Sequence, residues 1–182
     1  MEVGSRSDAQ RSVDAIVTAA RDALAQDSAA GLTTIAERAG VHRATLYRHF
    51  PTRDALIAEL YDAYLADAAA AVLETDVEAD DLWAELAAVT RRIYEVNISW
   101  RAYAWAPPYS AQTRTQQPDL VDVLSALFRA LRSQGLVRRH MSVHELCITW
   151  GAPVQFLAAR VDEGDWTLDG VVDYVLRLIG PE

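Results

Sequence analysis

Apolar residues recur every three or four positions through most of the chain, a spacing that places them along one face of an α-helix. Alanine, the strongest helix former, is abundant, and no segment has a convincing strand pattern. The periodic segments are residues 12–25, 32–39, 45–50, 52–73, 81–96, 118–131, 143–161 and 168–179. The sequence therefore predicts an all-α fold of about nine helices, without an internal repeat.

Local residues predict where several of these helices begin and end. Hydroxyl and carboxylate side chains cap helix N-termini, and glycine commonly follows a C-terminus. The predicted N-terminal caps are Asp8 or Ser12, Thr52, Ser142 with Glu145 as a capping box, and Thr167, and the predicted C-cap is Gly135.

Composition excludes several classes of protein. Apolar residues make up 51% of the chain, enough for a sizeable core and too many for a disordered chain. The single cysteine, Cys147, excludes an internal disulfide framework, and no run approaches the ~18 apolar residues of a membrane span. The first residues are polar and include acids, unlike a signal peptide. We therefore expect a cytoplasmic protein with no membrane partner.

The chain contains no familiar catalytic motif: neither Gly-x-Ser-x-Gly, nor a P-loop, nor Gly-x-Gly-x-x-Gly. The best metal candidates are His140, His144, Glu145 and Cys147. A helix that begins after Ser142 leaves His140 outside it, however, and a closed site needs three or four converging ligands. We expect no catalytic residue, no metal and no cofactor, and we do not expect an enzyme.

The net charge of −9 argues against a nucleic-acid partner for the chain as a whole, but the charge is unevenly distributed. Residues 31–53 contain Arg38, Arg43, Arg48 and Arg53 against the single acid Glu37, a net of +3, so the rest of the chain sums to −12. Exposed charges separated by more than about 8–10 Å are largely screened at ordinary salt. An arginine patch can therefore bind phosphate within an acidic protein.

Residues 32–50 have the pattern of a helix-turn-helix. Ala36 lies in the first helix, and Gly40 permits the tight turn that follows. The outward face of the second helix would carry His42, Arg43, Ala44, Thr45, Tyr47, Arg48 and His49. Arginine bonds guanine bidentately, and Thr, Tyr and Arg bond phosphates. The segment indicates DNA binding, although a helical hairpin with a solvated basic face would have the same spacing.

Three runs here resemble a known family: IAERAGV at 35–41, TLYRHF at 45–50 and RDAL at 53–56. In order, spacing and residue type they resemble the DNA-binding signature of the tetracycline-repressor (TetR) family of transcriptional regulators. The resemblance covers roughly the first third of the chain. It implies a homodimeric, ligand-responsive repressor whose paired recognition helices enter successive major grooves of a near-palindromic operator.

The resemblance also implies which residues contact DNA. His42, Arg43 and Ala44 would face base edges, and most of the other positions would contact the phosphate backbone. Gly31 stands where the family often has a hydroxyl residue, so Thr33 or Thr34 would have to supply that contact. The implied DNA-binding residues are Thr33, Thr34, His42, Arg43, Ala44, Thr45, Tyr47, Arg48, His49 and Arg53, the last where the family usually has lysine.

The remainder of the chain would bind the effector and form the dimer. The resemblance places a pocket among the middle helices, where Trp83, Tyr94, Trp100, Tyr103 and Trp105 are dense, and this composition favours an aromatic or hydrophobic effector. Each of these aromatics could equally be a core residue. The resemblance further implies a homodimer through the last two helices, residues 143–161 and 168–179, although a buried hairpin within one chain would show the same apolar faces.

Two domains follow: a helix-turn-helix DNA-binding domain at residues 1–58, and a regulatory ligand-binding and dimerisation domain at residues 59–182. The alternative function is an all-α small-molecule-binding or interaction protein in which the helix-turn-helix is structural only.

Overall fold

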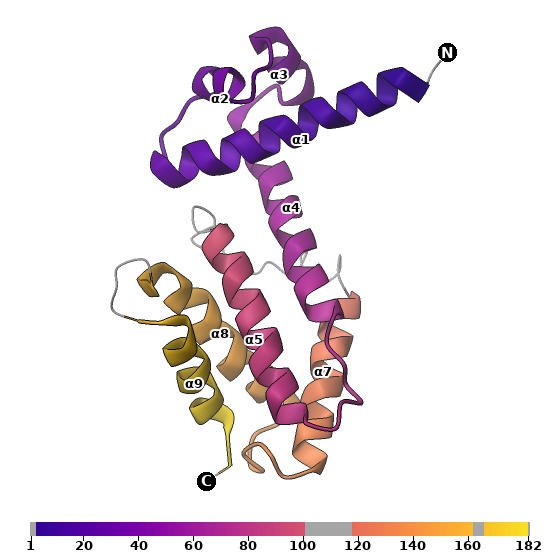
Figure 1. Ribbon diagram of the computed structural model, residues 1–182, viewed down its shortest axis with the longest axis vertical. Helices are drawn as coiled ribbons and strands as arrows, with labels where there is room; N and C mark the ends of the chain where they lie inside the picture. Colours follow the sequence, from indigo (N-terminus) through magenta and orange to yellow (C-terminus); the bar gives the residue numbers. More distant parts are fainter. Residues whose placement is uncertain (1–2, 101–117, 162–165, 182) are drawn as a thin grey trace. The chain divides into compact units, whose positions relative to one another are not determined.

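The computed structural model describes residues 3–100, 118–161 and 166–181. Within these ranges the chain forms eight α-helices and no strand (Figure 1), which confirms the all-α class and is close to the expected nine or so. The helices are α1 (Val3–Gln26), α2 (Leu32–Arg38), α3 (Arg43–His49), α4 (Arg53–Leu73), α5 (Leu82–Ser99), α7 (Pro118–Ser133), α8 (Val143–Val161) and α9 (Leu168–Ile179). In the same ranges, none of the helices has both the length and the apolar character needed to cross a membrane.

The chain divides into two compact units, Met1–Leu65 and Ala66–Glu182, and α4 begins in the first and ends in the second. In the first unit α1, α2 and α3 contact one another, with α2 and α3 on the same side of α1 (Figure 1). The core of this unit, which includes the start of α4, consists of side chains at most 1% exposed: Ile16, Ala20, Ala23, Ile35, Ala36, Leu46, Leu56 and Leu60. Because α2 and α3 are too short to be stable alone, this packing is what holds them in place.

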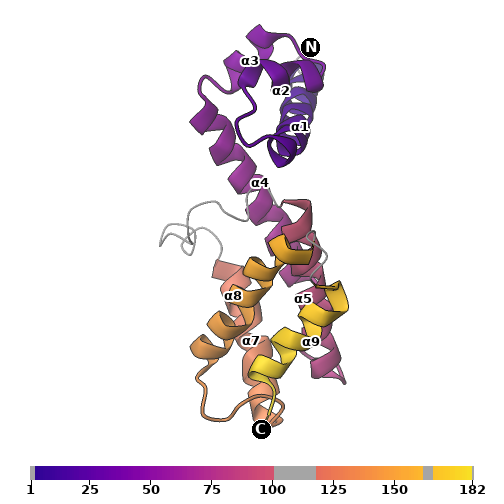
Figure 2. The ribbon, with the colours of Figure 1, turned by 90° about the vertical axis from the view of Figure 1, so that its left-hand side faces the viewer.

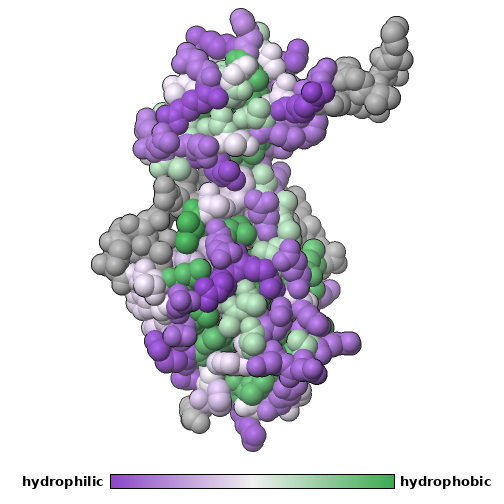
Figure 3. All heavy atoms as spheres, in the orientation of Figure 1, coloured by the Kyte–Doolittle hydropathy of each residue, from purple (hydrophilic) through white to green (hydrophobic). Residues whose placement is uncertain are grey.

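In the second unit α5 and α8 contact each other, and each also contacts α7 and α9 (Figure 2). The most deeply buried side chains of this bundle include Leu86, Val89, Tyr94, Leu127, Phe128, Leu131, Leu146, Val154, Val171, Val175 and Ile179. Two buried polar residues of α5, Thr90 and Asn97, lie among them. On the face shown in Figure 3, hydrophobic side chains reach the surface between hydrophilic ones.

Most helix ends predicted from local chemistry are confirmed. Thr52 Oγ1 accepts a hydrogen bond from Ala55 N at 3.1 Å, and Thr167 Oγ1 accepts one from Gly170 N at 3.1 Å. Gly135 follows α7 with a φ of +71°, the left-handed conformation that favours glycine.

A capping box begins α8, as predicted. Ser142 Oγ accepts from Glu145 N at 3.2 Å, and Glu145 Oε2 accepts from both Ser142 N and Ser142 Oγ at 2.7 Å. These bonds, chiefly the one from the Ser142 backbone N–H, hold the pKa of Glu145 below its ordinary value. Across the part of the chain that the structure describes, no three His, Cys, Asp or Glu side chains lie together as a metal site would require.

Two predicted helix starts are wrong. α1 begins at Val3 rather than at residue 12, so Asp8 and Ser12 are interior residues and not caps. Asp8 pairs with Arg11 at 2.6 Å, and Ser12 Oγ donates to the Asp8 carbonyl oxygen at 3.0 Å. Such polar pairs extend a helix beyond its apolar stripe, so periodicity does not reveal it. α3 begins at Arg43 rather than at residue 45, because the residue before it acts as the N-cap.

Candidate nucleic-acid interface

Gly40 makes the turn between α2 and α3. Its φ is +65°, a conformation that L side chains rarely adopt. Val41 N donates to Ala36 O at 3.1 Å and Gly40 N donates to Glu37 O at 3.2 Å, so the last carbonyl groups of α2 are satisfied within the turn. The turn thus ends α2 and directs the chain into α3 with little connecting backbone.

One face of α3 is anchored in the core and the opposite face is exposed. Leu46 is fully buried, and Phe50, directly after the helix, is 5% exposed. The residues of the outward face are His42, Arg43, Ala44, Tyr47 and Arg48, all exposed, with Thr45 and His49 half-buried beside them. Tyr47 exposes 42% of its surface, so the unit's core does not use this ring. The predicted DNA-contacting residues of α3 therefore share one surface.

The four arginines of the basic segment fall into two pairs. Arg38 Nη1 donates to Gln26 Oε1 at 2.9 Å, and Arg53 Nη2 donates to the Ser28 carbonyl oxygen at 2.7 Å. None of the four has a carboxylate within ion-pair distance among the described residues. Arg43 and Arg48 therefore bring two uncompensated positive charges to the outward face of α3.

The remaining predicted contacts lie beside α3. Thr33 is half-buried and Thr34 is exposed, and Gly31 is the N-cap of α2 without a side-chain hydrogen bond. His49 Nε2 is buried with no hydrogen-bond partner among the residues described, and its ring lies against Phe50 with a centroid separation of 6.4 Å. His49 is thus packed at the end of α3 rather than fully presented to solvent.

The aromatics predicted to line an effector pocket have a different environment. Tyr94 is fully buried, and its hydroxyl donates to the Leu157 carbonyl oxygen at 3.1 Å. Trp100 is 3% exposed, and its Nε1 donates to Asp67 Oδ2 at 2.7 Å. In the second unit these two side chains are hydrogen-bonded parts of the interior.

The other predicted pocket residues are less informative. Trp83 is half-buried at the edge of the core, where its ring lies close to Gly180. Tyr103 and Trp105 lie outside the described residues.

The sequence did not indicate the partners within two polar clusters of the second unit. Thr90 donates to the Leu86 carbonyl oxygen at 2.6 Å and accepts from Trp150 Nε1 at 2.8 Å, which joins α5 to α8 in the core. The available signal was a threonine four residues after Leu86 on an apolar stripe. Its partner on α8, 60 residues away, has no such signal.

Arg92 forms the second cluster. Its Nε donates to the Ala71 carbonyl oxygen at 2.9 Å, and its Nη2 donates to Glu85 Oε1 at 3.1 Å and to Thr75 Oγ1 at 3.2 Å. Arg92 therefore ties the end of α4 and the following loop to α5. A guanidinium is suited to this place because it complements the carbonyl groups at a helix C-terminus.

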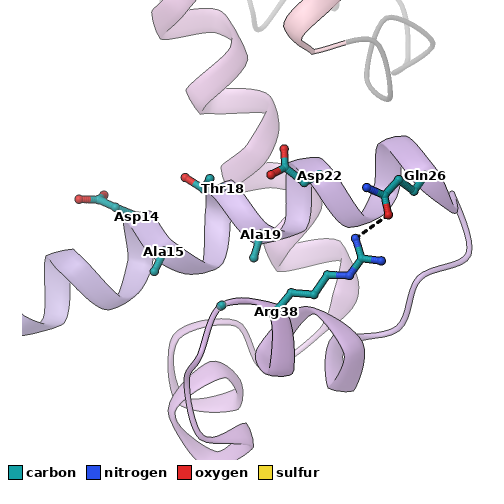
Figure 4. A pocket seen from close by; sticks show the side chains of 8 residues that line it. Asp14, Ala15, Thr18, Ala19, Asp22, Gln26 and Arg38 are labelled. Atoms are coloured by element: carbon teal, nitrogen blue, oxygen red, sulfur yellow. Dashed lines mark hydrogen bonds between the residues drawn. The ribbon is translucent and has the colours of Figure 1, made fainter.

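An open groove of about 560 Å³ lies between α1 and α2 of the first unit (Figure 4). It is lined by Asp14, Ala15, Thr18, Ala19, Asp22, Gln26, Arg38 and Ala39. Figure 4 shows Asp14, Thr18 and Asp22 along α1, with Arg38 directed towards Gln26. Its lining combines alanines with polar and charged side chains, and none of the described aromatics predicted to bind an effector contributes to it.

Comparison with known proteins identifies the fold and the segment that contains the turn. Solved structures similar to the chain include a TetR family transcription regulator from Marinobacter aquaeolei VT8, with a TM-score of 0.72 and 16% identity over 99% of this chain and 100% of that one. The TetR family transcriptional regulator PfmR from Thermus thermophilus has a TM-score of 0.66 and 18% identity over 89% and 97%. The fatty acid degradation regulator FadR from Bacillus halodurans has a TM-score of 0.70 and 15% identity over 91% and 93%.

Residues 16–60 match the family model described as "Bacterial regulatory proteins, tetR family", whereas no curated protein matches the chain. The matched segment includes the turn at Gly40 and the exposed face of α3, which together define a helix-turn-helix DNA-binding regulator. Residues 16–60 are therefore similar to the DNA-binding segment of the tetR family, the whole chain has the fold of solved TetR family regulators, and the resemblance stated from the sequence is confirmed.

Proposed function

We propose that the protein is a ligand-responsive repressor that binds a near-palindromic operator as a homodimer. Residues 1–58 would bind DNA and residues 59–182 would bind the effector and form the dimer. The observation on which the proposal rests is the outward face of α3, where Arg43 and Arg48 are exposed and have no carboxylate partner among the described residues. A merely structural helix-turn-helix does not require two uncompensated arginines on a helix of seven residues.

In this proposal His42, Arg43 and Ala44 face base edges, because they begin the helix that enters the major groove. The backbone contacts come from Thr33, Thr34, Thr45, Tyr47, Arg48, His49 and Arg53. A phosphate contact by Arg53 is compatible with its hydrogen bond to the Ser28 carbonyl oxygen, because the guanidinium has further N–H donors. The acidic remainder of the chain would disfavour non-specific association with DNA.

Helix α8 supports a dimer contact. Ile148 is 55% exposed and Phe156 is 57% exposed, and with the exposed Ala152 between them they recur every four residues on one helix face. The apolar residues of α9 are buried or partly buried in the chain's own core, and its exposed residues include Asp169, Asp173 and Arg177. In a dimer through the last two helices, α8 would supply the apolar centre and α9 a polar rim.

The effector would bind in the second unit near Trp83, Tyr94, Trp100, Tyr103 and Trp105, and an aromatic or hydrophobic molecule suits this lining. Tyr94 and Trp100 are buried and hydrogen-bonded, so effector binding would have to displace or extend these contacts. Because linkage is reciprocal, an effector that releases the operator must itself be bound more weakly in the presence of operator.

Selection of bound fragments from random DNA tests the operator proposal. The expected result is a palindromic consensus whose binding weakens steeply as salt rises, because arginine contacts release counterions. Recovery of no consensus would favour the alternative, an all-α binding protein with a structural helix-turn-helix.

Sedimentation tests the dimer. Phe156→Arg should convert a dimer to a monomer, because it places a charge on the apolar face of α8. The matched control is Leu73→Arg, at a residue of α4 that is also apolar and 52% exposed. If both variants sediment as the wild type does, the proposed interface on α8 is wrong.

A further inference from the structure

His42 is an exposed residue that caps the N-terminus of α3 with one of its two ring nitrogens. It is the N-cap of α3, with extended backbone at φ −66° and ψ 141°, and its Nδ1 accepts a hydrogen bond from Ala44 N at 3.3 Å. The side chain is exposed on the outward side of the helix. An imidazole in this role is unusual, because the usual N-caps are Ser, Thr, Asp and Asn.

The capping bond determines which nitrogen of the ring carries the proton. A neutral imidazole has one donor nitrogen and one acceptor nitrogen, and a protonated ring has two donors. Because Nδ1 accepts from Ala44 N, the proton of the capping ring is on Nε2. As long as His42 caps α3, it therefore presents an N–H donor to whatever lies against this helix.

We propose that His42 selects guanine, as a hydrogen-bond donor, at one base pair of each operator half-site. This inference rests on the proposed function, because it requires α3 to lie in the major groove. Guanine presents two acceptors there, N7 and O6, and no donor, whereas adenine and thymine each present one acceptor and cytosine presents the N4 amino group, a donor. The Nε2–H group is complementary to guanine and opposes the cytosine amino group at the same place on the strand.

Substitutions of His42 can distinguish its role as the N-cap of α3 from its proposed hydrogen bond to a base. His42→Asn keeps a side-chain oxygen for the cap and an amino group as donor, whereas His42→Asp keeps the cap but is an acceptor alone. His42→Ala removes both. Asp and Asn are good N-caps, so a difference between these two variants reports on the polarity of the contact rather than on the stability of α3.

The experiment selects bound fragments from random DNA with the wild type and all three variants, and thermal melting by circular dichroism verifies that each is folded. We expect the wild type to select guanine at the contacted position and His42→Asn to select a purine there, because its amino group can donate to N7 of guanine or adenine. His42→Asp should replace this guanine with cytosine or adenine, whose amino groups are donors. His42→Ala should lose the preference at that base pair and keep the rest of the half-site.

Competition between the wild-type operator and one with the contacted pair inverted measures the size of the effect. The wild type should prefer its own operator by about three- to tenfold, the range expected of one hydrogen bond, and His42→Asp should reverse the order. If no base pair changes its preference between the wild type, His42→Asp and His42→Ala, the inference is overturned, because His42 then contacts a phosphate or nothing. A wild type that selects no consensus overturns the proposed function itself.

Discussion

Helices α3 and α5 both contain residues singled out by their chemistry, but they use them in opposite ways. In α3 Arg43, Tyr47 and Arg48 are exposed, and Leu46 is the buried residue of the helix. In α5 Thr90, Tyr94 and Asn97 are buried with the apolar residues. Polar side chains on a short exposed helix can bind a partner, whereas in a bundle the same kinds of side chain form hydrogen bonds within the protein's own core. Substitutions in α3 should therefore change binding, and those in α5 should change stability.

The strongest test of this contrast is Tyr94→Ala. Removing a fully buried aromatic should lower the free energy of unfolding by about 3–5 kcal/mol, because it leaves a cavity in the core of the second unit. Tyr94→Phe keeps the ring and loses the bond to the Leu157 carbonyl oxygen, so it should cost about 1 kcal/mol. Urea unfolding measures both. A Tyr94→Ala variant as stable as the wild type would mean that this ring lines an open pocket instead.

The next effect concerns binding. Arg48→Ala should weaken operator binding by about 1.5–3 kcal/mol through loss of a charged hydrogen bond, and should reduce the salt slope by about one. Tyr47→Ala should also weaken binding, by less. Because both side chains are exposed, the free energy of unfolding should stay within about 0.5 kcal/mol of the wild type.

The matched control for this pair is Arg129→Ala, an exposed arginine on α7 outside the basic segment. It changes the net charge by the same amount and should leave operator affinity unchanged at physiological salt, because distant surface charges are screened. Equal losses for Arg48→Ala and Arg129→Ala would indicate a non-specific effect of charge and would remove α3 from the binding surface.

The same contrast explains what the sequence could predict. The turn at Gly40, the capping box at Ser142 and the cap at Thr167 depend on residues within a few positions of one another, and the local pattern determined them. The outward face of α3 follows from helical periodicity once Leu46 is placed inside.

Contacts between distant segments could not be predicted in this way. Arg53 was expected to neutralise a phosphate, and nothing near it in the sequence indicates that it also donates to Ser28, 25 residues earlier. The start of α1 was missed for a different reason: polar pairs such as Asp8 with Arg11 extend that helix without an apolar stripe. The environment of Tyr94 likewise depends on α8, which local pattern cannot position.

A smaller effect on stability should come from Thr90→Val, which leaves the buried Trp150 Nε1–H without its acceptor. We expect a loss of about 1–2 kcal/mol, the cost of an unsatisfied buried donor. In a double-mutant cycle with Trp150→Phe the two losses should be less than additive, because the second change removes the stranded donor. Strict additivity in urea unfolding would show that the two side chains do not interact in solution. It would also argue against a stabilising role for the buried polar side chains of α5.

The smallest effect is pH-dependent and concerns the capping box of α8. The pKa of Glu145 is lowered in the folded state, so the ionised carboxylate stabilises the fold above the ordinary glutamate pKa of about 4.3, and this stabilisation is lost as the pH falls through the lowered value. Glu145→Gln should therefore be less stable than the wild type near neutral pH, and the difference should shrink on acidification.

Ser142→Ala is the matched variant for this test. It removes the hydroxyl but keeps the backbone N–H, which is the largest cause of the lowered pKa of Glu145. Part of the acid dependence should therefore survive in Ser142→Ala and disappear in Glu145→Gln, as measured by thermal melting between about pH 3 and pH 7. A stability difference between wild type and Glu145→Gln that stays constant over this range would mean that the carboxylate is not held by the cap. The second unit would then depend on its buried contacts alone for the start of α8, which would sharpen its contrast with α3, where an exposed imidazole caps the helix.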